Sequence, residues 1–209
     1  MPGAGPSEAD KRLRQTLWLV IGLNLTFFVV EFIVALSIGS VSLFADSVDF
    51  VEDTAMSLLV LAAVRLSPLT RARLGFAFAG VLLLPAIAFL VTLAHKLISA
   101  TPLVPEPALF ALTGLAAFTV NTTCALLLAR VRNAAGSLTR AAFLSARNDM
   151  IANIAIMAAA GVTALWPSIW PDIVVGLGIA ALNADAAREI WEAARSEHGA
   201  ALGGPDAPG

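Results

Sequence analysis

Residues 41–61 read VSLFADSVDFVEDTAMSLLVL, an apolar stretch that four acids interrupt. About 20 predominantly apolar residues make a helix long enough to cross the roughly 30 Å hydrocarbon core of a bilayer. This stretch has that length. Asp46, Asp49 and Asp53 are spaced by three and four residues, so a helix stacks them on one face, with Glu52 beside them. The stretch therefore predicts a membrane-spanning helix with a stripe of carboxylates.

The carboxylates make this helix expensive to expose to lipid. An acid at the middle of a membrane helix costs roughly 2.5–3.5 kcal/mol, and a strong apolar residue offsets only about 0.3–0.6 kcal/mol. Four acids cost on the order of 10 kcal/mol, of which the Val, Leu and Phe residues offset roughly half. The acids must therefore line a wet cavity, bind a cation or carry protons. Asp46, near one end of the helix, could instead be solvated at the membrane surface.

The rest of the chain repeats the apolar pattern. Of its 209 residues, 58% are hydrophobic and 13% are charged, against about 45–50% and about 25% in soluble domains. Backbone groups cannot stay unpaired in lipid, so apolar segments of this length are expected to be helices. They cover Thr16–Leu36, Val41–Val64, Leu74–Ile98, Ala108–Leu128, Leu138–Trp166 and Ile169–Ile190. We predict an all-α integral membrane protein with six transmembrane helices in a lipid bilayer. The net charge of −2 gives no reason to expect a nucleic-acid partner.

Basic residues predict the orientation through the positive-inside rule. One side carries only Lys96, which we expect to be solvated beside His95 at the outer end of the third helix. The other side, which includes both termini, is therefore predicted to be cytoplasmic. Its basic residues are Lys11, Arg12, Arg14, Arg65, Arg71, Arg73, Arg130, Arg132, Arg140, Arg188 and Arg195. Residues 1–15 are expected to form a disordered tail, 16–192 the six-helix domain and 193–209 a short second tail.

Polar residues also lie in the other helices. Ser145, Asp149 and Asn153 repeat every four residues and so share one face of the fifth helix. Arg147 lies two residues from Asp149, on a different face, which makes an ion pair within that helix awkward.

Three further polar residues lie in the first and fourth helices. Asn24 and Glu31 are seven residues apart on the first helix, and Asn121 lies on the fourth. A single Asn in a membrane helix usually forms a hydrogen bond between helices. Glu31 is either a proton carrier or a structural partner.

These residues resemble the cation diffusion facilitator family of divalent metal transporters. GSVSLFADSVDFVEDTAMSLL (residues 39–59) is similar to the family's second helix, where His or Asp followed four residues later by Asp supplies two metal ligands. Asp49 and Asp53 occupy those positions. GSLTRAAFLSARNDMIANIAI (residues 136–156) is similar to the fifth helix. There Asp149 matches the second ligand, and Ser145 stands where the first should be.

The resemblance implies a homodimer that exports a divalent metal from the cytoplasm in exchange for protons, with the metal as substrate and no cofactor. Asn153, one turn past Asp149, is a further candidate ligand. Asp46, Glu31, Asn24 and Asn121 are expected beside the site or along the ion pathway. The family's cytoplasmic C-terminal α/β domain is expected to be missing, so the dimer would form through membrane helices. We expect a multi-pass protein of a prokaryotic inner (plasma) membrane and no enzyme activity.

The choice of metal follows from the ligands. Carboxylates with the neutral oxygens of Ser145 and Asn153 favour manganese, iron or cobalt over zinc, which usually takes nitrogen or sulfur. The resemblance places zinc narrowly first, with cadmium also considered.

The sequence is also compatible with two other functions. Ser145 and the missing domain would also suit a non-transporting membrane scaffold that retains the fold. A proton-coupled exporter of organic cations would need a roomy aromatic cavity, for which the second and fifth helices offer only Phe44, Phe50 and Phe143.

Overall fold

The computed structural model describes residues 8–63, 70, 73, 89–131 and 137–202. These residues form helices and short connections, with no strand among them, which confirms the predicted all-α fold with six helices. The labelled helices are α1 (Glu8–Ile38), α2 (Val41–Ala63), α4 (Pro107–Ala129), α5 (Ser137–Leu165) and α6 (Trp170–Leu202). A shorter helical segment, Phe89–Ile98, is the described part of the predicted third helix. The start of that helix lies outside the described residues, as do Arg65, Arg71 and Arg132 and the outer parts of both predicted tails (1–7 and 203–209).

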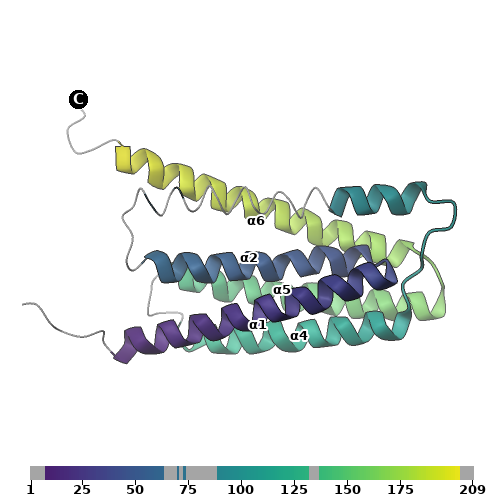
Figure 1. Cartoon of the computed structure of the whole chain (residues 1–209), viewed down its shortest axis with the longest axis horizontal. Helices are drawn as coiled ribbons and strands as arrows, with labels where there is room; N and C mark the ends of the chain where they lie inside the picture. Colours follow the sequence, from purple (N-terminus) through teal and green to yellow (C-terminus); the bar gives the residue numbers. More distant parts are fainter. Residues whose placement is uncertain (1–7, 64–69, 71–72, 74–88, 132–136, 203–209) are drawn as a thin grey trace, which may run out of the picture.

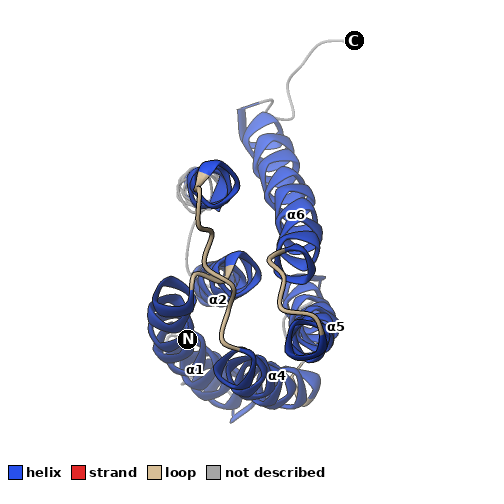
Figure 2. Cartoon of the chain, turned by 90° about the vertical axis from the view of Figure 1, so that its right-hand side faces the viewer, coloured by secondary structure: helices blue, strands red, loops and turns tan. Residues whose placement is uncertain are grey.

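The helices form an elongated bundle with α2 at its centre (Figures 1 and 2). Figure 2 shows α1, α4 and α5 in an arc around α2, with α6 on the remaining side. Helix α2 packs against α1, α4, α5 and α6. The position of α2 explains how its acids avoid lipid: every residue from 41 to 50 is buried inside the protein.

Three described helical segments are long and apolar enough to span a membrane: α1, α4 and Ala142–Leu165 of α5. Shorter apolar stretches are Phe89–Ile98 and Trp170–Leu182 of α6. Large apolar side chains are exposed along the outer faces, for example Ile33 on α1 and Leu112 on α4. Exposed apolar surface of this kind suits a lipid environment.

Two helices are longer than the sequence predicts. Helix α1 begins at Glu8 instead of Thr16, so part of the expected disordered tail is helical, and α6 continues past Ile190 to Leu202. The added turns are rich in Ala, Glu, Lys and Arg, which are good helix formers in water. The apolar pattern marks only the part of each helix that lies in lipid.

The N-terminus of α2 is held by a buried cluster that we call the Asp172 clamp, consisting of Ser40, Val41, Ser42, Lys96 and Asp172. The Asp172 carboxylate accepts hydrogen bonds from the backbone N–H groups of Val41 and Ser42 (both 2.9 Å) and from the hydroxyls of Ser40 and Ser42 (both 2.7 Å). Lys96 forms a 2.7 Å ion pair with the same carboxylate. Lys96 is only 6% exposed, so the expectation that it is solvated is wrong. Asp172, in the first turn of α6, thus caps the N-terminus of α2.

Two glycines allow this close approach. Gly39, with φ of 65°, forms the turn between α1 and α2, and its carbonyl accepts a 2.7 Å hydrogen bond from Lys96. A Cβ added at Gly176 of α6 would lie 3.0 Å from the backbone nitrogen of Ser42 and 3.1 Å from the carbonyl carbon of Val41. Only glycine lets α6 approach the α2 backbone this closely.

Candidate metal site

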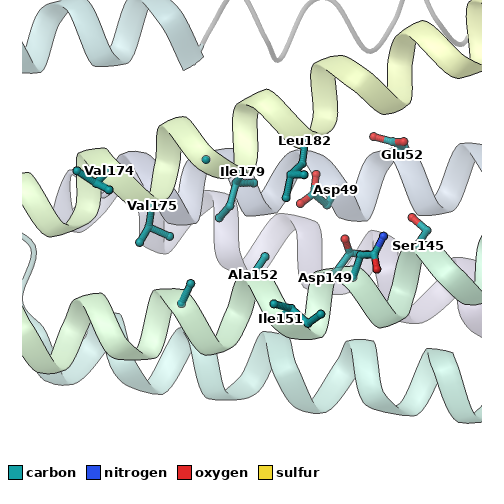
Figure 3. A pocket seen from close by; sticks show the side chains of 13 residues that line it. Asp49, Glu52, Ser145, Asp149, Ile151, Ala152, Val174, Val175, Ile179 and Leu182 are labelled. Carbon is teal, nitrogen blue, oxygen red and sulfur yellow. The ribbon is translucent and has the colours of Figure 1, made fainter.

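A cavity of about 770 Å³ lies between α2, α5 and α6 (Figure 3). One wall carries Asp49 and Glu52 of α2, and a second carries Ser145, Asn148 and Asp149 of α5. The remaining wall is mostly apolar. Its residues include Ala152, Val174, Val175, Ile179 and Leu182. The described lining residues include no aromatic side chain.

The carboxylates at this cavity are buried without enough partners. Asp49 and Asp53 are 6% and 4% exposed, and Asp149 is half-buried. Within the part of the chain that the structure describes, Oδ1 of Asp49, Oδ1 of Asp53 and Oδ2 of Asp149 have no hydrogen-bond partner. Among the described residues, none of these acids forms an ion pair. A buried carboxylate oxygen left unpaired costs about 1–3 kcal/mol or more, so this arrangement suits a group that a ligand completes.

Ser145 connects the remaining acid of the stripe to the cavity. Its hydroxyl lies close enough to the carboxylate of Asp53 to interact with it, while the residue itself lines the cavity beside Asp149. Asp53 does not line the cavity directly. Ser145 therefore lies between Asp53 and Asp149, at the position where a first ligand from α5 would be expected.

Asn153 lies one turn further along α5 and faces a different set of side chains. Its amide Nδ2 donates a 2.5 Å hydrogen bond to Asp46, and its Oδ1 accepts a 3.1 Å hydrogen bond from Asn121. Asn153 is not among the cavity-lining residues. The structure thus separates Asn153 from the other four candidate ligands.

Two polar residues of α1, Asn24 and Glu31, are also fully buried. Glu31 lies within hydrogen-bond reach of Asp46, yet no donor from the described ranges reaches either of its carboxylate oxygens. Asn24 accepts a 3.4 Å contact from the thiol of Cys124, and its Nδ2 has no partner in the described part of the chain. Arg147, by contrast, is exposed. The α1 face of the acidic stripe therefore meets Glu31, while the α5 face meets the cavity.

The sequence predicts that Asp49, Ser145 and Asp149 belong to one site, and in the structure all three line the same cavity. Glu52 and Asn148 also line this cavity, although the sequence pattern did not identify them as site residues. The spacing of Glu52 from Asp49 is three residues, which places the two on neighbouring positions of one helical face and would have identified it. Across the described residues, no three His, Cys, Asp or Glu side chains lie close enough together to hold a metal in this conformation.

A model described as the cation efflux transmembrane domain matches residues 17–196. The matched range contains α2, α4 and α5 entirely, and with them the cavity. No curated protein sequence matches the chain.

Proposed function

Because the chain belongs to the cation efflux, or cation diffusion facilitator, family of transporters, we propose that it exports a divalent metal from the cytoplasm in exchange for protons. Membership makes it a membrane protein that transports cations, and the members of this family are transporters rather than enzymes. The observation that supports the metal site is the set of buried carboxylate oxygens without partners on Asp49, Asp53 and Asp149.

The proposed ligands are Asp49, Asp53 and Asp149, with the Ser145 hydroxyl as a neutral oxygen. Each carboxylate has an oxygen free to coordinate, and Ser145 already contacts Asp53. Binding would draw α2 and α5 together, since the acids do not form a closed site as they stand. Asn153 is left out of this set because both ends of its amide are already paired. Its proposed role is to position Asp46.

Zinc is the first proposed cation, by family resemblance. The donors are all oxygens, however, and oxygen ligands suit manganese, iron and cobalt at least as well. We therefore expect weak discrimination among these ions. The absence of aromatic side chains among the described cavity-lining residues argues against an organic cation as the substrate.

Proton coupling follows from charge. Three ionised carboxylates at and beside a mostly apolar cavity, those of Asp49, Asp149 and Asp53, are stable only with a counter-charge, since the desolvation of each is costly. A divalent metal supplies that charge while it is bound, and protons replace it after release. Movement of α2 and α5 against the rest of the bundle would expose the site to each side in turn.

The orientation and assembly are also proposals. Described basic residues at the cytoplasmic end include Lys11, Arg14 and Arg73, which favours cytoplasmic termini. The α1–α2 turn and the Asp172 clamp would then lie at the outer side. On the basis of the family resemblance, we also propose that the protein forms a homodimer through its membrane helices and lies in a prokaryotic inner membrane.

Transport can be tested in proteoliposomes loaded with a zinc-sensitive dye. We expect zinc entry into vesicles to rise when the lumen is more acidic than the bath and to fall when the gradient is collapsed. A rate of zinc entry that does not depend on the pH gradient would argue against exchange with protons. No zinc, cobalt or manganese entry at all would favour the scaffold alternative.

A further inference from the structure

A second group of buried oxygens lies apart from the cavity, where α1, α2, α4 and α5 meet. Glu31 of α1 is within hydrogen-bond reach of Asp46 of α2. Asp46 accepts from Asn153 of α5, which accepts in turn from Asn121 of α4. Four side chains from four helices thus form one connected network. All four are at most 1% exposed.

This network has more acceptors than donors. Both carboxylate oxygens of Glu31, Oδ1 of Asp46 and Oδ1 of Asn121 have no hydrogen-bond partner among the residues that the structure describes. The side-chain donors within it are the amide groups of Asn121 and Asn153, each of which already donates one hydrogen bond. No basic side chain pairs with either acid among the described residues. Two carboxylates in contact and shielded from water cannot both stay ionised without a positive charge between them.

We propose that Glu31 and Asp46 form a second binding site for a divalent cation on the transport path, with Asn153 and Asn121 supporting Asp46. The site rests on the proposed function, because it is a station for the same substrate. A shared proton would satisfy one contact between the two acids and leave the other oxygens unpaired. A cation accepts several oxygen ligands at once, and hard divalent ions prefer carboxylate and amide oxygens.

The position of this second site suits a further binding step on the transport path, after the site at Asp49. Asp46 precedes Asp49 by one helical turn and lies nearer to Gly39, the turn between α1 and α2. Because α1 and α2 are antiparallel and joined at that turn, Glu31 reaches α2 at about the level of Asp46. An ion leaving Asp49 toward the α1–α2 end would therefore meet Glu31 and Asp46 next. Asn153 holds Asp46 in place for that ion.

The test removes the first site by substitution and measures the metal that still binds. The purified protein, with Asp49→Asn and Asp149→Asn, is placed in lipid nanodiscs. Equilibrium dialysis then gives the number of radioactive zinc or manganese ions bound per chain. We expect about one ion per chain to remain bound, and adding Glu31→Gln to weaken that binding more than about tenfold. Gln is nearly isosteric with Glu and its amide can donate to Asp46, so the bundle should fold. Glu192→Gln, which removes an exposed acid of α6, is the matched control and should change nothing.

Two results would overturn the second site: no metal bound to the Asp49→Asn/Asp149→Asn protein, or residual binding that Glu31→Gln leaves unchanged. If the double variant does not fold, Glu31→Gln alone must lower the number of ions bound at saturation relative to wild type, and an unchanged number overturns the proposal. Failure here leaves the main function intact, since transport that depends on Asp49 and Asp149 is measured separately.

Discussion

The side-chain amide of Asn153 donates a 2.5 Å hydrogen bond to the carboxylate of Asp46, and both residues are completely buried. This bond divides the polar face of α5 into two parts. Asp149 and Ser145 face the cavity, while Asn153, one turn away, faces the acids on the α1 side. The acidic stripe of α2 therefore has different partners at its two ends.

Replacing Asn153 with Ala should destabilise the bundle. The change leaves Asp46 and Asn121 buried without their shared partner, and a hydrogen bond to a charged group contributes about 1.5–3 kcal/mol. We expect a loss of about 1–3 kcal/mol in reversible unfolding from mixed micelles. Asn148→Ala, at an exposed position on the same helix, is the control. Equal stability of the two variants would show that the Asn153 bond contributes little.

Replacing Lys96 with Met should be more costly. It leaves the carboxylate of Asp172 buried without its cation, and breaking a buried ion pair from one side costs about 3–5 kcal/mol. Lys11→Met removes the exposed Lys11–Glu8 pair, which contributes about 0–1 kcal/mol. A loss for Lys96→Met no larger than the loss for Lys11→Met, in the same unfolding assay, would contradict the role of the clamp.

Gly176→Ala should separate α6 from α2, because the new Cβ would meet backbone atoms of Val41 and Ser42 that cannot move aside. Gly178→Ala, two residues further along α6, meets nothing within 4 Å. Alanine is favoured over glycine in helices by about 1 kcal/mol, so the second variant should be neutral or stabilising. The unfolding midpoint should therefore fall for Gly176→Ala and stay unchanged or rise for Gly178→Ala, and an equal change in both proteins would argue against the close approach.

Ser145→His should alter metal preference. An imidazole at this position adds the nitrogen ligand that zinc favours and that the all-oxygen set lacks. We expect zinc affinity to rise on the order of tenfold, about 1.4 kcal/mol, relative to manganese. Competition between the two metals in purified protein measures the ratio, with Ser145→Ala as the control for loss of the hydroxyl. An unchanged ratio would place Ser145 outside the coordination sphere.

Much of this organisation follows from sequence. Apolar length predicted helices, and three-and-four spacing put Asp49 and Asp53 on one face of α2. Spacing could not show how the acids divide between neighbouring helices, because that depends on how α1, α2 and α5 are rotated in the bundle. Asn153 shares a face with Asp149 in the pattern yet contacts Asp46 in the structure.

The Asp172 clamp was missed for a similar reason. Lys96 lies near the end of an apolar segment, where solvation is the usual outcome. Its burial depends on Gly39, Gly176 and Asp172, which are far apart in the sequence and meet only after the helices pack. A local pattern gives no sign of such a contact.

Asp49 and Asp149 are the proposed ligands of the transported metal. The most direct test of this role is zinc uptake into proteoliposomes whose lumen is more acidic than the bath. The comparison is between wild type, Asp49→Asn, Asp149→Asn and the exposed control Glu192→Gln. We predict that Asp49→Asn and Asp149→Asn each reduce the initial rate by about a hundredfold, equivalent to about 2.7 kcal/mol, while Glu192→Gln transports like wild type. Wild-type rates in Asp49→Asn and Asp149→Asn, in protein that is folded and correctly inserted, would contradict the account.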